Sequence, residues 1–208
     1  MFNPMSAGSA HCPVVARHAA SLIVLRDGPS GPEALMGLRG AGHRFMPNHL
    51  VFPGGAVDPG DNTAPAASEL RQEVMRHLLI SADPALARGL AIAAARELEE
   101  ETGLTLGRPP QLEGFDYLCR AVTPEASPVR FDARFLVVHA DRVSGSLAGS
   151  GELEGLRWYR LEEALALQPA LVTQNVIGRL QDWLAMSPQA RRTRARTPLL
   201  FERTWRLE

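Results

Sequence analysis

The stretch RELEEETGL, residues 96–104, is the part of the sequence around which the rest is organised. Asp83-Pro84 upstream is a favourable helix start, an N-cap residue followed by proline at the first helical position. Gly103 is a favourable stop, because glycine adopts the left-handed conformation beyond a helix end at little cost. The residues between are rich in alanine, leucine and glutamate, which are strong helix formers. The sequence therefore predicts a long helix between Asp83 and Gly103.

Three carboxylates crowd one side of this predicted helix. Glu97, Glu100 and Glu101 fall within an arc of roughly 100° at helical periodicity. They should repel one another, and they lie near the negative C-terminal end of the helix dipole. No lysine or arginine stands one turn before Glu97 or Glu101 to relieve them. Small and apolar residues form the neighbouring stripe, which we expect to pack against a sheet: Ala91, Ala94, Ala95 and Leu98.

The carboxylate cluster has two interpretations. One is a solvated acidic face, and the other is a site for a hard divalent cation, which takes carboxylate oxygens and bridges to phosphates. Arg96 can pair with Glu99 or Glu100, which relieves one charge and leaves the others. The apolar stripe beneath the carboxylates favours the cation site.

This stretch resembles the second half of the Nudix box, G-x5-E-x7-R-E-U-x-E-E-x-G-U with U aliphatic. The seven residues that fill its defined positions are Arg96, Glu97, Leu98, Glu100, Glu101, Gly103 and Leu104. Upstream, Phe52-Pro53-Gly54-Gly55 is the usual sequence at the start of the box in this family.

The first half of the box departs from the pattern. Counting back from Arg96 places Ala82 at the glycine position and Arg88 at the first glutamate position. With Gly55 as the box glycine, the distance to Arg96 is 96 − 55 = 41 positions instead of 14, an insertion of 27 residues. Counting forward from Gly55 places Asp61 at the first acidic position. We interpret the motif as split by an insertion rather than broken.

Composition bounds the possibilities. A chain of 208 residues with a net charge of −1 fits a single domain, and it gives no case for nucleic acid or a membrane surface as partner. Its two cysteines, Cys12 and Cys119, are too few for a disulfide framework and are expected to fill space in a reducing compartment. The N-terminal residues lack the pattern of a signal peptide, and no apolar run is long enough to span a membrane. We expect a cytoplasmic protein, with a homodimer as one option.

Periodicity and turn residues predict the order of elements. The expected strands cover residues 16–26, 33–39, 49–52, 115–122, 129–139 and 156–160. Helices are expected from Leu161 and over residues 171–186. The single domain, 1–208, would have its core at residues 16–186, a helical insertion at 62–83 and a basic tail at 187–208. In the insertion, a helix starting at Pro65 would bury Leu70, Val74, Met75 and Leu78. It would be a packed extra helix or, alternatively, a lid or dimer element beside the site. The arginines of the tail are Arg191, Arg192, Arg194 and Arg196, which predict a solvated linker or, alternatively, a phosphate contact.

This order of elements resembles the Nudix fold over residues 16–186. The expected fold class is α/β (α+β), an α/β/α sandwich with a mixed β-sheet and a helical insertion. The long insertion and the residues around Phe52-Pro53-Gly54-Gly55 resemble the subgroup that includes the peroxisomal coenzyme A diphosphatases. The match is incomplete, because the coenzyme A signature expects Arg-Ser and His-x-Gly where this chain has Arg39-Gly40 and His43-Arg44-Phe45.

The resemblance implies an enzyme that hydrolyses a nucleoside diphosphate linked to another group, X, with Mg2+ or Mn2+ as cofactor. It implies metal ligation by Glu97, Glu101, Glu100 and the Gly55 carbonyl, and catalytic roles for Glu100, Glu97 and Arg96. A late-loop carboxylate would serve as base, with Glu152, Glu154 and Glu125 as candidates. The expected substrate-binding residues are Arg39, Arg44, Phe52 and Gly54. Further cations that a bulky X could meet are His43, Arg71, Arg76 and His77.

Two rival functions come from other classes. A Nudix fold can be a catalytically silent nucleotide-sensing module, which degraded box glutamates would indicate, and here they are intact. A carboxylate-bridged di-iron bundle needs paired Glu-x-x-His motifs, and no histidine follows any box glutamate at that spacing.

Overall fold

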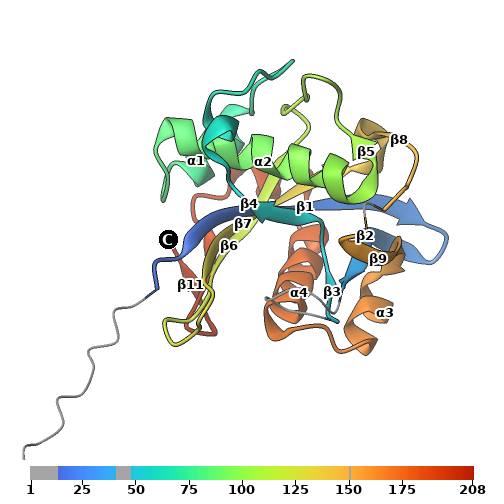
Figure 1. Cartoon of the computed structure of the whole chain (residues 1–208). Helices are drawn as coiled ribbons and strands as arrows, with labels where there is room; N and C mark the ends of the chain where they lie inside the picture. Colours follow the sequence, from blue (N-terminus) through green and yellow to red (C-terminus); the bar gives the residue numbers. More distant parts are fainter. Residues whose placement is uncertain (1–13, 41–47, 150) are drawn as a thin grey trace, which may run out of the picture.

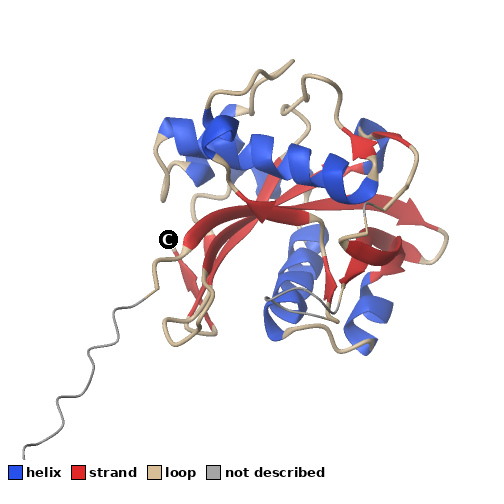
Figure 2. Cartoon of the chain, viewed as in Figure 1, coloured by secondary structure: helices blue, strands red, loops and turns tan. Residues whose placement is uncertain are grey.

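The computed structural model describes residues 14–40, 48–149 and 151–208. One mixed sheet of nine strands is covered on both faces by helices (Figures 1 and 2). The strand order along it is β11-β10-β6-β7-β1-β2-β3, with β4 paired to β1 and β9 paired to β2. This architecture confirms the predicted α+β class with a mixed sheet.

The elements run along the chain as follows. The sheet contains β1 (Arg17–Gly28), β2 (Gly31–Arg39), β3 (Leu50–Val51), β4 (Gly54–Ala56), β6 (Asp116–Val122), β7 (Phe131–His139), β9 (Leu153–Arg160), β10 (Pro198–Phe201) and β11 (Thr204–Leu207). A separate pair is formed by β5 (Leu104–Thr105) and β8 (Ser144–Gly145). The helices are η1 (Pro59–Asn62), α1 (Gln72–Leu78), α2 (Pro84–Thr102), η2 (Ala140–Arg142), α3 (Leu161–Ala166), α4 (Leu171–Ala185) and α5 (Pro188–Thr193).

Strand β1 is the centre of the sheet and is buried on both faces. It pairs in parallel with β7 along residues 17–25 and antiparallel with β2 and β4 on its other edge. Leu22 and Val24 belong to the core cluster beneath α1 and α2, whereas Ile23 and Leu25 belong to the cluster beneath α3 and α4. Alternation along a strand sends successive side chains to opposite faces, so this apolar run supplies both cores.

Helix α2 has the ends that the sequence predicts. Asp83 caps it by accepting a hydrogen bond from the Leu86 amide at 2.8 Å, and Pro84 is the first helical residue. Gly103 ends it with a φ of 74°. The stripe of Ala91, Ala94, Ala95 and Leu98 is buried in the core between the helix and the sheet, as predicted.

The insertion contains a helix, but it is shorter than the sequence suggests. Pro65 does not start it, because α1 begins at Gln72. The residues before α1 bond instead to the loop before β6: the Ala67 amide donates to the Pro110 carbonyl at 2.9 Å, and the Leu112 amide donates to the Ser68 carbonyl at 3.3 Å. Val74 and Leu78 are buried as predicted and join the core under α2.

The C-terminal segment is folded, and its prediction as a solvated linker is wrong. Residues 188–193 form α5, and β10 and β11 form a hairpin in which β10 pairs in parallel with β6. The Arg191 guanidinium donates to carbonyl oxygens at the end of α4 and lies 4.1 Å from the centre of the Trp183 ring. Arginines are frequent in this segment, but its buried residues, Thr197, Pro198 and Leu200, attach it to the sheet.

The cysteines and the apolar character of the helices bear on two further predictions. Cys119 is a free, buried thiol, consistent with its predicted role in packing, and Cys12 lies outside the described residues. Among the helices in the described part of the chain, none is both long and apolar enough to cross a membrane.

Candidate active site

The end of α2 brings the box carboxylates against β4. The side chain of Glu101 is only 2 % exposed and that of Glu97 is 14 % exposed, whereas that of Glu100 is 57 % exposed. The helix places all three within its last two turns, and β4 follows Pro53 directly beneath them. The three carboxylates are therefore unequal, two of them inside the protein and one at its surface.

Glu101 is a buried carboxylate with one amide donor and one arginine close to it. It accepts a hydrogen bond from the Gly54 amide at 2.8 Å, and the nearest guanidinium nitrogen of Arg39 is 3.8 Å away. Burial raises the pKa of Glu101 to about 8, the Gly54 amide opposes this, and the nearby charge of Glu97 adds to it. A cation at this position would remove the unfavourable effect of burying the carboxylate.

Glu97 lies against a residue that must lack a side chain. A Cβ atom on Gly55 would lie 2.2 Å from Oε1 of Glu97, so any other residue there would displace the carboxylate. Burial raises the pKa of Glu97, and the charge of Arg96 and its hydrogen bond oppose that shift. Gly55 thus places its own backbone beside a buried carboxylate, which is the close approach expected for a glycine in this position.

Arg96 joins the two halves of the split motif. Its guanidinium donates to both carboxylate oxygens of Asp61 at 3.1 Å and to the Ala56 carbonyl at 3.1 Å. It also donates to Glu97 at 2.9 Å and to Glu100 at 3.0 Å. Burial alone would lower the pKa of Arg96, but the bonds to Asp61 and the charge of Glu97 outweigh it and raise that pKa.

The insertion therefore leaves Asp61 in position while the chain between Asp61 and α2 forms a separate element. Asp61 lies in η1, where its carboxylate also accepts a bond from the Asp58 amide at 2.8 Å. Arg88 would occupy the first acidic position of the motif if there were no insertion. It instead donates to the Glu69 carboxylate at 3.1 Å. The expected pairing of Arg96 with Glu100 is present, whereas Glu99 pairs with Arg108.

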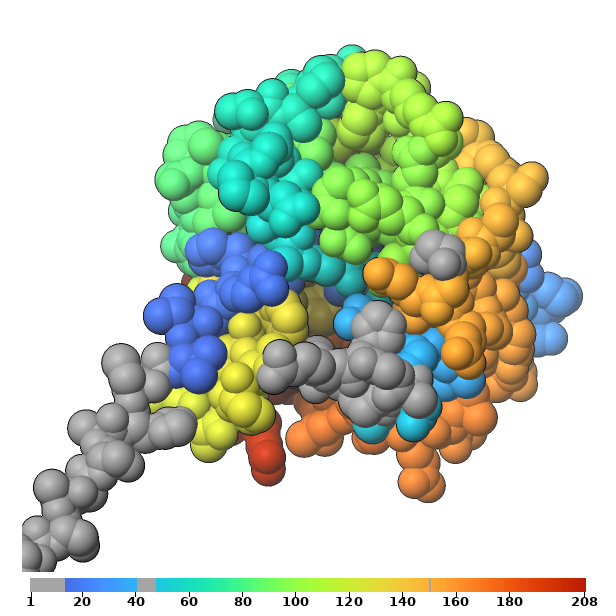
Figure 3. Space-filling view, viewed as in Figure 1, coloured from blue at the N-terminus to red at the C-terminus, as the bar shows by residue number. Residues whose placement is uncertain are grey.

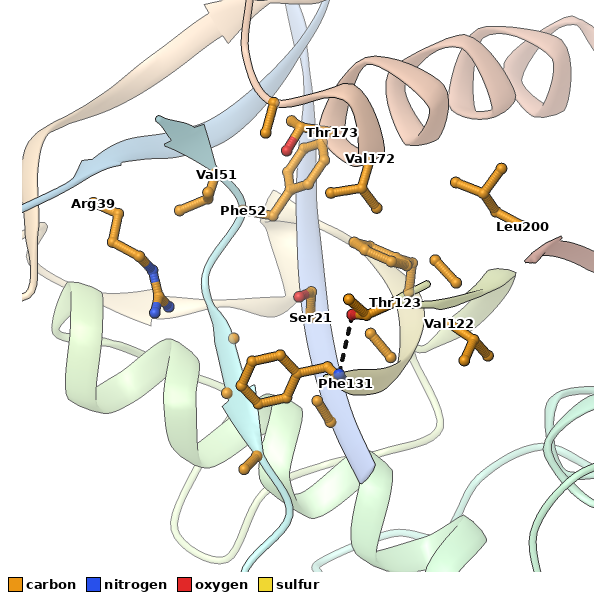
Figure 4. Close-up of a pocket in the computed structure, with 18 of the residues that line it drawn as sticks. Ser21, Arg39, Val51, Phe52, Val122, Thr123, Phe131, Val172, Thr173 and Leu200 are labelled. Atoms are coloured by element: carbon orange, nitrogen blue, oxygen red, sulfur yellow. Dashed lines mark hydrogen bonds between the residues drawn. The ribbon is translucent and has the colours of Figure 1, made fainter. Parts of the chain in front are cut away.

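A pocket of about 760 Å³ opens beside these glutamates on the α4 side of the sheet. In Figure 3 the surface is hollowed beside the yellow segment that follows β6. Of the predicted substrate-binding residues, Arg39, Phe52 and Gly54 line the pocket, and Arg44 lies outside the described residues, as does His43. Figure 4 shows Arg39 at one end of the pocket and Leu200 and Val122 at the other.

The three candidate bases differ in whether they line the pocket. Glu152 lines the pocket, and its charge contributes to the raised pKa values of Glu97 and Glu101. Glu154 and Glu125 are exposed and do not line it. The structure thus brings one of the three candidates to the site.

The cations of the insertion do not reach the pocket, and the expectation that they meet a bulky X is wrong. Arg71 is paired with the Asp116 carboxylate and donates to the Phe115 carbonyl at 2.8 Å. His77 is 3 % exposed, and its Nδ1 lies 2.8 Å from the Thr197 hydroxyl. Arg76 donates to the Arg192 carbonyl at 3.4 Å. These residues connect α1 to β6 and to the C-terminal segment.

Other pocket residues were not predicted at all. They are contributed by β1, β7, the start of α4 and the C-terminal hairpin, and they include Arg17, Phe131, Thr173, Leu200 and Arg203. Strand periodicity could have identified Phe131 as facing one side of the sheet. Nothing local identifies Leu200 or Arg203, because their place depends on pairing between β10 and β6, about eighty positions apart in sequence.

The residues at the end of α2 fit a divalent cation by their chemistry. Carboxylate and carbonyl oxygens are the ligands that hard cations take, and the absent side chain of Gly55 lets the Glu97 carboxylate lie against the backbone. Within residues 14–40, 48–149 and 151–208, no three histidine, cysteine, aspartate or glutamate side chains already enclose a metal position. Protein ligands here would be Glu97, Glu101 and a backbone oxygen, with Glu100 reaching in from the surface.

Comparison with known proteins points to one family. A model of the NUDIX domain matches residues 88–179. A NUDIX hydrolase from Alicyclobacillus acidocaldarius is 25 % identical, with a TM-score of 0.56 over 79 % of this chain and 92 % of the other. A MutT NUDIX hydrolase from Burkholderia pseudomallei is 20 % identical, with a TM-score of 0.53 over 80 % and 99 %. The NUDIX domain of Shewanella oneidensis NrtR, solved with ADP ribose, is 13 % identical, with a TM-score of 0.54 over 88 % and 94 %. No curated protein is similar enough in sequence to count as a match.

The matched domain and the hydrolase structures support the Nudix superfamily for this chain. The same similarities support a Nudix pyrophosphohydrolase as the class of protein. Nudix hydrolases generally depend on divalent metals such as Mg2+ or Mn2+ and cleave the diphosphate of nucleoside diphosphate derivatives.

Proposed function

We propose that the protein hydrolyses the diphosphate of a nucleoside diphosphate linked to a bulky group X, with coenzyme A or another ADP-containing compound as substrate. The observation that supports this most is the shape of the site. The buried Glu101, the partly buried Glu97 and Gly55 line a pocket of about 760 Å³, whose other walls contain many apolar residues. A site of this size holds a whole nucleotide derivative rather than a phosphate alone.

In this proposal Glu97, Glu101 and the Gly55 carbonyl hold the divalent cation, and Glu100 joins them or orients water. When bound, the cation neutralises charge on the diphosphate and lowers the pKa of a bound water. Arg96 positions Glu97 and Glu100 through the bonds described above, while Asp61 fixes Arg96. The Gly54 amide fixes Glu101 from the other side. Each carboxylate is thus held in place by a neighbouring residue.

Proton removal from the attacking water is assigned to Glu152. Of the candidate bases it is the one that lines the pocket, and it lies close enough to affect the pKa values of Glu97 and Glu101. Its carboxylate is exposed, so a proton that it takes from the water can pass on to solvent.

The substrate is tested by comparing kcat/KM for coenzyme A, ADP-ribose and dGTP with Mg2+ or Mn2+. We expect both ADP-containing compounds to be preferred over dGTP. A tenfold or greater preference for dGTP, about 1.4 kcal/mol of transition-state discrimination, would overturn the bulky-substrate proposal. Arg44→Ala in the same comparison tests whether Arg44 contributes to the preference. Binding of these nucleotides without turnover under any metal condition would instead favour a nucleotide-sensing module.

A further inference from the structure

The C-terminal hairpin forms the end of the pocket that lies farthest from the glutamates. Leu200 on β10 is opposite Ala121 on β6, and both residues line the pocket. The turn between β10 and β11 is fixed by the Glu202 carboxylate, which accepts a hydrogen bond from the Glu125 amide at 3.1 Å. Arg203, in that turn, also lines the pocket. The matched NUDIX domain region ends at residue 179, so the hairpin lies outside it.

The walls at this end are apolar and partly aromatic. They are formed by Ala121, Val122, Phe131, Phe135, Val172 and Leu200. Phe135 packs edge-on against Phe52, with ring centres 6.5 Å apart. The Phe131 amide is held by the Thr123 hydroxyl at 3.0 Å, which closes the loop between β6 and β7 (Figure 4). Such a recess suits a flat, largely apolar group such as a nucleobase.

Two arginines stand among these apolar walls. Arg17 lies on β1, where it is paired with Phe131 of β7. Arg17 and Arg203 both line the pocket and are both exposed. Within the part of the chain that the structure describes, neither guanidinium forms an ion pair with a carboxylate. Arg39, which also lines the pocket, differs from them because its guanidinium lies 3.8 Å from the Glu101 carboxylate. Unpaired guanidinium groups beside an apolar recess are suited to a phosphate carried by the group that fills the recess, because arginine binds phosphate through paired hydrogen bonds.

We propose that the C-terminal hairpin completes a second subsite, which binds a nucleoside whose ribose carries its own phosphate monoester. The base occupies the apolar recess, and Arg203 and Arg17 bind the extra phosphate, while the scissile diphosphate lies at the glutamates. This deepens the proposed function and rests on it, because it assigns the orientation and the class of the substrate within the same pocket.

The test compares substrates that differ by this one phosphate. Coenzyme A is paired with dephospho-coenzyme A, and NADPH is paired with NADH, so that a preference can be measured for whichever compound is hydrolysed. We expect the wild-type protein to prefer the phosphorylated member at least tenfold in kcat/KM. In Arg203→Ala and in Arg17→Ala the KM for the phosphorylated member should rise severalfold or more, with KM for the other member unchanged.

Arg196→Ala is the matched control, because Arg196 is an exposed arginine just before the hairpin and does not line this pocket. It should leave the preference as it is in the wild type. Equal losses for both members of a pair in Arg203→Ala and Arg17→Ala would mean that the arginines only support the fold, and would overturn the proposal. No preference in the wild-type protein would also overturn it.

A binding measurement separates this proposal from the proposed function. Adenosine 3′,5′-bisphosphate and AMP contain no diphosphate bond, so calorimetry reports their affinities whether or not the protein is a hydrolase. We expect tighter binding of the bisphosphate, with the difference lost in Arg203→Ala. Equal affinities, or no binding of either, would overturn the subsite even if diphosphates are hydrolysed. A preference for the bisphosphate without any hydrolysis would support the subsite and contradict the proposed function.

Discussion

Gly55 is as important to the geometry of this site as the glutamates, because the Glu97 carboxylate can approach the backbone only where a side chain is absent. Gly55 does not have a positive φ, so its conformation is open to other residues. What excludes them is the Glu97 carboxylate, which lies where a Cβ would be. A run of glutamates without this glycine would present the same charges with a different geometry.

Gly55→Ala tests this contact directly. The added methyl group should push the Glu97 carboxylate away and lower kcat/KM by at least about tenfold, roughly 1.4 kcal/mol. The fold should persist, because only the far end of a flexible side chain has to move. Gly60→Ala is the control, since a Cβ on Gly60 meets nothing within 4 Å, and it should retain activity. Steady-state kinetics and circular dichroism of both variants decide the matter, and full activity of Gly55→Ala would contradict the assignment.

Glu152 and Glu154 form a natural matched pair for the assignment of the base. They lie two residues apart and are both exposed, but Glu152 alone of the two lines the pocket. Glu152→Gln should lower kcat by roughly 10²-fold, the usual contribution of a general base. Glu154→Gln should behave as the wild type. A loss of activity in Glu154→Gln with an active Glu152→Gln would reverse the assignment.

Among the larger elements, the insertion and the C-terminal segment stabilise each other. The ring of His77 in α1 stacks on Tyr117 of β6, with ring centres 5.6 Å apart, and its Nδ1 bonds to Thr197 just before β10. From the other end of the insertion, Ser81 accepts hydrogen bonds from the buried Arg134 guanidinium of β7 at 2.9 and 3.1 Å. Two segments that the sequence presents as additions to the core are therefore attached to the same sheet strands.

His77 should make stability depend on pH. Burial, with the charges of Arg194 and Arg76, lowers the pKa of His77 from 6.5 to about 4. In the unfolded chain the histidine takes up a proton below pH 6.5, whereas in the folded protein it resists until about pH 4. The unfolded state therefore binds more protons in this window, and the free energy of unfolding falls as the pH is lowered through it.

We expect this contribution to be on the order of 2 kcal/mol across the window. His77→Gln removes the titration, so urea unfolding of the two proteins should show the largest advantage of the wild type above pH 6.5. That advantage should shrink as the pH approaches 4. A difference between the two proteins that stays constant from pH 7 to pH 4 would show that His77 does not titrate as described.

For the molecule as a whole, the two faces of the sheet have separate roles. The face under α1 and α2 is a closed apolar core, whereas the face toward α4 opens into the pocket near the ends of β1, β6 and β7. Helix α2 belongs to the first face, yet its last two turns reach the second face past the side-chain-free Gly54 and Gly55. A divalent cation at that point would connect the two layers.

Removal of divalent metal should therefore affect both activity and stability. Excess EDTA should abolish turnover, and Mg2+ or Mn2+ should restore it. Without substrate, metal at 100 times its Kd should raise the free energy of unfolding by about 2.7 kcal/mol. Glu101→Gln should remove this stabilisation, while Glu99→Gln should keep it, because Glu99 lies on the same helix but pairs with Arg108. Full turnover in EDTA, or metal stabilisation of Glu101→Gln, would contradict the metal site.

The sequence by itself determined the parts of this protein that depend on local physics. The ends of α2 follow from Asp83, Pro84 and Gly103, and its buried stripe follows from helical periodicity. The strands before and after it follow from apolar runs bounded by turn residues, and the carboxylate cluster follows from spacing. Each of these depends on residues within a few turns of one another.

Only the tertiary structure decided which distant residues meet. Arg96 donates hydrogen bonds to Asp61 although a long insertion separates the two residues in the sequence. Counting positions in the motif made Asp61 a candidate, but it could not show that the two side chains meet. Leu200 and Arg203 line the pocket because β10 pairs with β6. No local sequence pattern in this short segment predicts that pairing. Pairing between distant strands depends on the sum of many weak contacts across the whole sheet, so its outcome is not contained in any one stretch of the chain.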